Sequence, residues 1–490
     1  MARGTGVTTQ FGALHGAIHG GAAAMTLCRR WKMSRPEQQG VCARFVTIIA
    51  CAIVLATSQA RAAPLEFTLH QIDGDKPGPT VLVIGGIQGD EPGGFNAASL
   101  LATHYQLRRG ALWVVPNLNF ESIVQRSRGV HGDMNRKFAT VLKSDPDYAR
   151  VVRIKAIITD PKVDYVLNLH DGSGFYRPQH IDSKHNPKRW GQSIIIDQET
   201  MPHFPYSDLE ARARRVTTNV NHRMRDPQHR IHVKNTRTGE GDVEMAKTLT
   251  YFAINESKPA VGIEASKSLP THLRAYYHLK IIEAYLHELG VVFERHFSLT
   301  PKSVRRALDE NIKVAFFDRR MTLNLAGARS SLRFVPMKKN AELHYEASSP
   351  LVAVRNSRNG YRVSYGNRRI TRLYPQFFEF DSSLEHVAMI VDGDHKKILV
   401  GGVVDVHERF SVTSIAGFRV NVIGWRRPRK KSDADVDISR ASIDARYSVD
   451  RAARVYRVEF YRGTRFAGMV LIRFVDSEHT AFSRTKRPLS

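Results

Sequence analysis

The stretch Thr80–Gly94, TVLVIGGIQGDEPGG, decides how the rest of the chain is interpreted. The apolar run Val81–Ile84 is typical of a buried strand, the glycines after it predict a tight turn, and the apolar residues from Phe95 onward predict a helix. In an open α/β sheet, ligands bind beyond the carboxyl ends of the strands, which is where this turn falls. The stretch therefore predicts an α/β fold and the position of its functional site.

Two polar side chains of the turn, Gln88 and Glu91, are three residues apart, so one helical pitch can direct both toward one point. A third candidate, His170, follows the apolar run Val163–Leu167 of another predicted strand. One carboxylate, one imidazole and one carbonyl oxygen, with a position left for water, describe a catalytic zinc site. The spacing alone leaves open that the turn binds no metal and that His170 is a structural histidine.

From residue 64 to residue 297 apolar strands alternate with amphipathic helices, which is typical of an α/β domain. The predicted strands are 80–87, 111–116, 163–170, 193–197 and 260–265. The predicted helices are 95–106, 146–158, 207–224 and 271–289. We therefore expect a mixed-sheet α/β domain over residues 63–298.

After Ser298 the pattern changes to short alternating runs without long helices. Two turn signals, Asn359-Gly360 and Asp392-Gly393, each separate two apolar runs and predict β-hairpins. We expect two all-β domains, a small one over 299–383 and an Ig-like β-sandwich over 384–490.

The N-terminal region predicts export. Phe45–Ala56, FVTIIACAIVLA, is an apolar segment preceded by Arg44, and Ala60–Ala62 has the small-x-small pattern of a cleavage site. We expect residues 1–62 to hold a signal peptide, with a superfluous extension before Met33. All three cysteines precede the expected cut, so a mature periplasmic chain would form no disulfide. The apolar segment is too short for a stable membrane span.

With 490 residues, 42% of them hydrophobic, the chain suffices for two or three domains. The formal charge of +26 makes nucleic acid the first partner to consider. However, the Lys and Arg residues are spread along the chain, and no recognised nucleic-acid-binding motif occurs. We therefore predict no nucleic-acid partner and favour an anionic substrate or an anionic polymer of the cell envelope.

Further polar residues follow the predicted strands. Asn135-Arg136 is suited to holding a carboxylate, since Arg presents a bidentate fork and Asn adds a donor. A nearby arginine, Arg128, can polarise a carbonyl and stabilise an oxyanion. Glu264 ends the strand 260–265, where a general base that activates water is expected. The alternative for each arginine is a surface ion pair.

These segments, taken in order, resemble the zinc carboxypeptidase superfamily of carboxypeptidase A. The segments are GGIQGDEPGG (85–94), NLNF (117–120), DMNRKF (133–138), NLHDGSG (168–174) and GIEAS (262–266). One departure is Gln88 at the position of the first zinc-binding His. That departure, together with the two β domains, resembles the three-domain peptidoglycan D,L-carboxypeptidases that determine helical cell shape.

The resemblance implies one zinc ion held by three ligands, Gln88, Glu91 and His170. It implies that Glu264 is the base and then the acid, and that Arg128 polarises the scissile carbonyl. It implies four substrate-binding residues, Asn135, Arg136, Trp190 and Thr250. Asp171 is not included, because neighbours along an extended strand point to opposite faces.

The reaction implied is hydrolysis of a peptidoglycan stem tripeptide, releasing meso-diaminopimelate and leaving a dipeptide stem. One alternative is a deacylase of the succinylglutamate desuccinylase or aspartoacylase kind, which shares the Asp-x-Asn-Arg-x-Phe pattern of 133–138. The export signal argues against it, because those substrates are cytosolic. The other is a wall-binding protein without activity. Glu264 argues against that one, because a pure binder has no use for a base at that strand end.

Overall fold

The computed structural model describes residues 65–202, 205–224, 226–425 and 431–476. The expected signal peptide, its cleavage site and the cysteines lie outside these residues. Within them, no helix is both long and apolar enough to cross a membrane.

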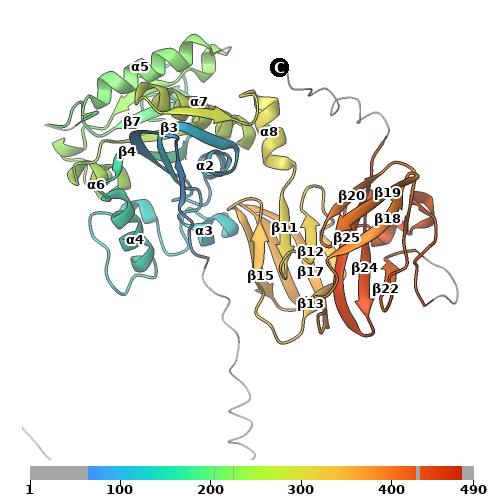
Figure 1. Cartoon of the computed structure of the whole chain (residues 1–490). Helices are drawn as coiled ribbons and strands as arrows, with labels where there is room; N and C mark the ends of the chain where they lie inside the picture. Colours follow the sequence, from blue (N-terminus) through green and yellow to red (C-terminus); the bar gives the residue numbers. More distant parts are fainter. Residues whose placement is uncertain (1–64, 203–204, 225, 426–430, 477–490) are drawn as a thin grey trace, which may run out of the picture. The chain divides into compact units, whose positions relative to one another are not determined.

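A mixed sheet forms the centre of the first domain (Figure 1). Its strands are β1 (His70–Asp73), β2 (Lys76–Ile84), β3 (Tyr105–Val115), β4 (Val163–Gly172), β7 (Ser193–Ile196), β8 (His232–Asn235), β9 (Ala260–Ser266) and β10 (Val292–Arg295). The order is β1-β3-β2-β4-β9-β7-β8, and β10 also pairs with β3. The four central strands β3, β2, β4 and β9 are parallel, whereas β1, β10 and β7 join antiparallel. The mixed sheet confirms the predicted fold class.

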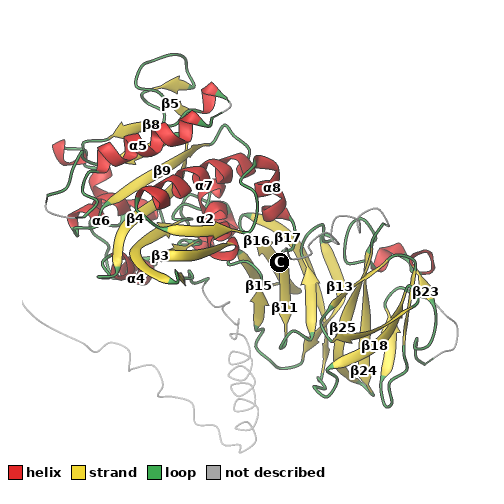
Figure 2. Ribbon diagram, turned by 45° about the horizontal axis from the view of Figure 1, so that its top comes forward, coloured by secondary structure: helices red, strands yellow, loops and turns green. Residues whose placement is uncertain are grey.

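The helices of this domain are α2 (Pro92–His104), α3 (Phe120–Gln125), α4 (Tyr148–Ile158), α5 (Leu209–His222), α6 (Leu249–Asn255) and α7 (Thr271–Glu288). Helix α2 packs beside α7, and α7 contacts α5 (Figure 2). The predicted helix 95–106 was wrong at both ends. It starts at Pro92, whose fixed φ suits a first helical position. It stops before Tyr105, where the buried-exposed alternation of β3 begins.

The first turn of α2 lies directly against β4. A Cβ atom at Gly94 would be 2.9 Å from the Cβ and the carbonyl oxygen of Leu169, and one at Gly93 would overlap the carboxylate of Asp171. The backbone N–H of Gly93 instead donates to Asp171 Oδ2 at 2.7 Å. The two glycines therefore let the turn approach the strand closely enough to form this bond.

Helix α8 (Pro301–Asp309) connects the first domain to the β region. It lies where only β structure was expected. Its Val304 and Leu308 are buried in the same apolar core as α7. Helix α8 begins at the cap residue Thr300, which accepts from Ser303 N. We therefore propose that the first domain extends through α8 rather than ending at residue 298.

Short strands make up the rest of the chain. The first group is β11 (Lys313–Phe316), β12 (Met321–Asn324), β13 (Ser331–Lys338), β14 (Tyr345–Ala347), β15 (Val352–Ser357), β16 (Gly360–Tyr365) and β17 (Arg368–Phe378). The second group is β18 (His386–Val391), β19 (Asp394–Leu399), β20 (Val403–Val406), β21 (Arg409–Val412), β22 (Arg419–Val422), β23 (Ile438–Ser439), β24 (Val455–Arg462) and β25 (Arg465–Phe474). These sheets confirm the all-β character of this region.

Both predicted hairpins form. Asp392 and Gly393 connect β18 to β19 with φ values of 52° and 94°, the left-handed conformation that a two-residue turn requires. The other turn is displaced by one residue, because Ser357 pairs with Gly360 and leaves Arg358 and Asn359 as the loop.

One apolar core contains residues of both β regions, and a second core lies within the later region. Val335 and Leu373 from the first group lie in the same buried cluster as Tyr461, Phe466 and Leu471 from the second. A boundary near residue 383 therefore divides the sequence but not the core.

We predict that Gly89→Ala destabilises the protein. A Cβ atom at Gly89 would overlap the backbone of Ser122 and Ile123 in α3, which cannot move as a flexible side chain would. Overpacking of this kind costs about 1–3 kcal/mol, so the melting temperature should fall by several degrees. Gly239→Ala is the control, because the nearest atom to its Cβ would be Tyr251 Oη at 3.7 Å. Equal melting temperatures for both variants would contradict the prediction.

Candidate active site

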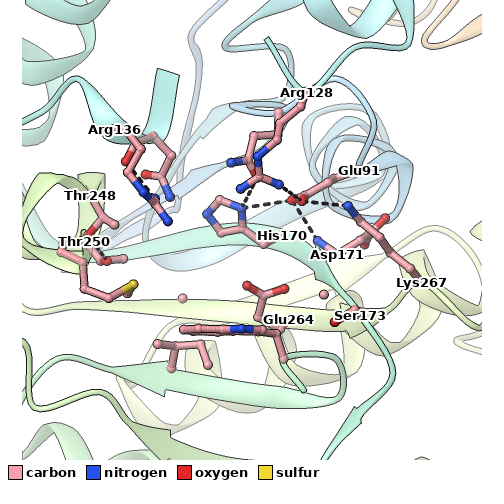
Figure 3. Close-up of a pocket in the computed structure, with 17 residues that line it drawn as sticks. Glu91, Arg128, Arg136, His170, Asp171, Ser173, Thr248, Thr250, Glu264 and Lys267 are labelled. Atoms are coloured by element: carbon pink, nitrogen blue, oxygen red, sulfur yellow. Dashed lines mark hydrogen bonds and ion pairs between the residues drawn. The ribbon is translucent and has the colours of Figure 1, made fainter. Parts of the chain in front are cut away.

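The three candidate metal ligands, Gln88, Glu91 and His170, converge at the carboxyl ends of β2 and β4. Figure 3 shows Glu91 and His170 facing each other. His170 Nδ1 lies 3.2 Å from Gln88 Oε1 and 3.0 Å from Glu91 Oε2. All three side chains are buried. Glu91 is fixed further by the backbone N–H of Asp171, which donates to its Oε2 at 3.0 Å.

Asp133 sets the orientation of the Gln88 amide. Gln88 Nε2 donates to Asp133 Oδ1 at 2.7 Å. An ionised carboxylate only accepts hydrogen bonds, and hydrogen bonds and nearby arginines outweigh burial and lower the pKa of Asp133. The NH₂ group must therefore face Asp133, which leaves Oε1 directed at His170 and Glu91.

This donor set fits a zinc ion. Donor atoms about 2.0–2.1 Å from a tetrahedral zinc lie about 3.3 Å from one another, close to the separations of 3.2 and 3.0 Å seen here. In the described part of the chain no cluster of three His, Cys, Asp or Glu side chains could hold a metal. Of the three proposed ligands only Glu91 and His170 belong to these residue types, because the third donor, Gln88, is an amide.

His170 also contacts a neighbour through its other ring nitrogen. Nε2 lies 2.8 Å from the side-chain amide of Asn168. A metal-binding histidine usually donates its second N–H to an acceptor. Rotating the Asn168 amide by 180° would direct its carbonyl oxygen, which is buried without a partner among the described residues, at this nitrogen. Asn168 therefore helps fix the imidazole.

Glu264 lies beside His170 because the two residues are register partners in β4 and β9. Its Oε2 atom is buried, and among the described residues it has no hydrogen-bond partner. Burial, opposed by the charge of His170 and reinforced by the charges of Glu91 and Asp171, raises the pKa of Glu264 to about 8. A carboxylate held in this way is a strong proton acceptor once it is ionised.

Arg128 faces the same centre from the loop after α3. Its Nε donates to Asp133 Oδ2 at 2.9 Å, and its NH1 lies 3.4 Å from Glu91 Oε1. Half of its side chain is exposed, so the guanidinium can also reach a bound ligand.

Asn135 and Arg136 line another part of the cavity. Asn135 Oδ1 accepts from Leu249 N at 3.0 Å, which leaves the Nδ2 donor for another partner. Arg136 Nε forms an exposed ion pair with Glu244 at 3.3 Å, and such a pair contributes little and exchanges readily.

The two remaining predicted residues also line this cavity, which has a volume of about 300 Å³. Trp190 lies in the loop before β7, and Lys234 Nζ lies 3.8 Å from its ring centroid. Thr250 is buried near the start of α6, with its hydroxyl 3.2 Å from that of Thr248. The structure therefore brings all nine predicted site residues to one cavity.

A family profile described as the catalytic domain of "carboxypeptidase controlling helical cell shape" matches residues 46–309. A second, the "C-terminal domain of metallo-carboxypeptidase", matches residues 380–475. The chain belongs to this family. It is thus a metallocarboxypeptidase, which implies a metal ion, and the fold confirms the predicted catalytic and C-terminal β parts.

Solved structures of the cell shape determinant protein Csd4 from Helicobacter pylori are similar over most of both chains. The product-bound and tripeptide-bound forms are each 38% identical, cover 84% of this chain and 100% of their own, and have TM-scores of 0.75. The mDAP-bound form, described as a D,L-carboxypeptidase, is 40% identical with a TM-score of 0.74, covering 81% of this chain and 97% of its own. No curated protein sequence matches the chain.

The sequence analysis did not identify two residues that contact the predicted site residues, Asp133 and Lys267. Asp133 stands in the DMNRKF segment, but its contacts with Gln88 and Arg128 depend on folding. Lys267 lies 3.2 Å from Glu91 Oε1 and has no motif of its own. The carboxylate of Asp171, which the prediction left out, bonds with Arg274 of α7 rather than with the metal-site side chains.

We predict that Glu264→Gln stabilises the metal-free protein at alkaline pH. The folded protein keeps Glu264 protonated up to about pH 8, whereas the ordinary pKa of an exposed Glu is 4.5. The stability linked to this proton is complete below that value and is lost as the pH rises through about 8. The variant stays neutral, so it should melt higher than wild type at pH 9 and nearly equally at pH 4.

The control is Glu240→Gln, because Glu240 is exposed. Differential scanning calorimetry of both variants after chelation gives the comparison. A difference from wild type that is equal at the two pH values would contradict the raised pKa.

Proposed function

We propose that the protein is a periplasmic zinc D,L-carboxypeptidase that trims the peptidoglycan stem tripeptide L-Ala-γ-D-Glu-meso-diaminopimelate. It would release meso-diaminopimelate, leave a dipeptide stem and take part in setting cell shape. Membership of the family and the tripeptide-bound and mDAP-bound forms of Csd4 support the substrate. The observation that carries the proposal is Glu264 beside the converging side chains of Gln88, Glu91 and His170.

The terminal carboxylate of the substrate docks on Arg136. The guanidinium exchanges its exposed partner Glu244 for this carboxylate, and Asn135 adds its Nδ2 donor. This contact sets the register of the peptide, so that the last peptide bond lies over Glu264. An enzyme that holds the terminal carboxylate in this way removes one residue at a time.

Gln88, Glu91 and His170 hold the zinc ion. When bound, zinc supplies Lewis-acid polarisation of the scissile carbonyl and lowers the pKa of water. Arg128 donates to the oxygen of that carbonyl as negative charge develops on it. Glu264 accepts a proton from the attacking water at its carboxylate and then delivers it to the nitrogen of the leaving diaminopimelate.

The released residue has a long side chain with an amine and a second carboxylate, and it needs room beyond Arg136. Trp190, Met245 and Thr250 line the same cavity. Aromatic and thioether surfaces suit the methylene part of that side chain, and the threonine hydroxyl suits its polar end.

Hydrolysis of purified tripeptide tests the function. Wild type with one equivalent of zinc should release meso-diaminopimelate, detected by mass spectrometry. Glu264→Gln should keep zinc and lose at least about a hundredfold in kcat. An absence of both bound zinc and turnover would support a wall-binding protein, and turnover of small N-acyl amino acids alone would support a deacylase.

We predict that Arg136→Ala abolishes the preference for a free terminal carboxylate. Wild type should favour the tripeptide over its C-terminal amide, and the variant should lose roughly 10- to 100-fold in kcat/KM on the tripeptide alone. Arg214→Ala, an exposed arginine of α5, is the control. An unchanged preference would assign the carboxylate to another residue.

We predict that Gln88→Ala loses zinc and activity, because two protein ligands remain. Gln88→His should bind zinc more tightly, since imidazole is a better donor than an amide oxygen. It should nevertheless be less active than wild type, because a displaced metal would be misaligned with Arg128 and Glu264. Zinc titration and tripeptide turnover measure both effects. Retention of zinc and rate by Gln88→Ala would exclude Gln88 as a ligand.

A further inference from the structure

Three cationic side chains line the cavity among the described residues: Arg128, Arg136 and Lys267. The proposed reaction uses the two arginines and leaves Lys267 without a role. Lys267 follows β9, three residues after Glu264, so its backbone is fixed by the strand that carries the base.

Lys267 occupies the side of the cavity away from Arg136. In Figure 3 the two cations lie on opposite sides of His170 and Glu264, with Ser173 on the Lys267 side. Lys267 Nζ lies 3.2 Å from Glu91 Oε1 and 3.2 Å from Asp90 Oδ2, and a third of its side chain is exposed. It is therefore held close to the reacting centre and remains open to the cavity.

These positions fix the direction of a bound peptide. A residue whose terminal carboxylate docks on Arg136 places the acyl half of the scissile bond toward Lys267. If the proposed function holds, that acyl half is a γ-linked D-glutamyl residue, which keeps a free α-carboxylate. Three carbons separate this carboxylate from the scissile carbonyl carbon, a span of about 5 Å when extended.

We propose that Lys267 binds the α-carboxylate of the γ-linked glutamyl residue and so determines specificity for the acyl side of the substrate. The hydroxyl of Ser173, an exposed residue of the same cavity, is a second donor. A compact ammonium with three rotatable donors suits this task, because it can keep Asp90 as a partner while it donates to the new carboxylate. An α-carboxamide at this position offers no charge and is bound less well.

The alternative is that Lys267 has an electrostatic role only and does not contact the substrate. In that case Lys267 would only balance the charge of Glu91 and Asp90, and removing it would change metal affinity without changing the choice of substrate. The two roles therefore differ in one measurable ratio, the kcat/KM for the α-carboxylate tripeptide divided by that for the α-carboxamide tripeptide.

The experiment compares wild type, Lys267→Met and Lys143→Met on these two tripeptides, with zinc content measured for each. Lys143 is an exposed residue and does not line the cavity. Wild type and Lys143→Met should favour the carboxylate form at least about tenfold, mostly through KM. In Lys267→Met the ratio should fall to near one while the carboxamide is still hydrolysed.

A ratio that stays unchanged in Lys267→Met would overturn the proposal, as would an equal loss on both tripeptides together with a loss of zinc. Hydrolysis of neither tripeptide by wild type would instead refute the proposed function. Melting temperatures of the three proteins verify that Lys267→Met is folded, and Lys267→Arg, which keeps the charge, should restore part of the ratio.

Discussion

The contact between the first turn of α2 and β4 is the constraint on which the site depends. Asp171, buried in β4, accepts from Gly93 N and from Arg274 of α7, while its own N–H donates to Glu91. One strand residue thereby holds two helices and one proposed ligand. Because side chains alternate along a strand, the same backbone directs His170 to the opposite face, toward Gln88 and Glu264.

Asp133 orients the side-chain amide of Gln88 so that its oxygen faces the proposed metal site. A glutamine side chain can present either end, and a free amide would lose entropy on being fixed. Asp133 removes this ambiguity and also holds Arg128, so one carboxylate orients a neutral donor and a cation together. Glutamine and histidine are both neutral ligands, so this departure from the usual set leaves the charge of a loaded site unchanged.

The central strands could be predicted from the sequence, and so could the meeting of residues such as Gln88, His170 and Glu264, because these stand in local motifs at or after strand ends. Trp190 and Thr250 stand in no such motif and were carried over from the family resemblance. Other features depended on contacts distant in sequence. Strand β10 is recognisable only through its pairing with β3. The ion pair of Lys267 with Glu91 likewise joins residues that no local pattern connects. Helix α8 does carry local signals that the prediction overlooked, the cap residue Thr300 and Pro301 at the first helical position. Local sequence thus encodes the ligands, whereas the tertiary fold supplies the residues that orient them.

The shared core couples the two β regions, although the later region also has a core of its own. A chain cut near residue 383 would remove Phe466 and Leu471 from the core that contains Val335 and Leu373. The same core reaches Phe120 of the first domain. Truncation would therefore impair catalysis by unfolding the support of α3, even if the removed segment never touched the cell wall. Point substitutions on exposed strand faces, rather than deletions, are the way to assign a role to this region.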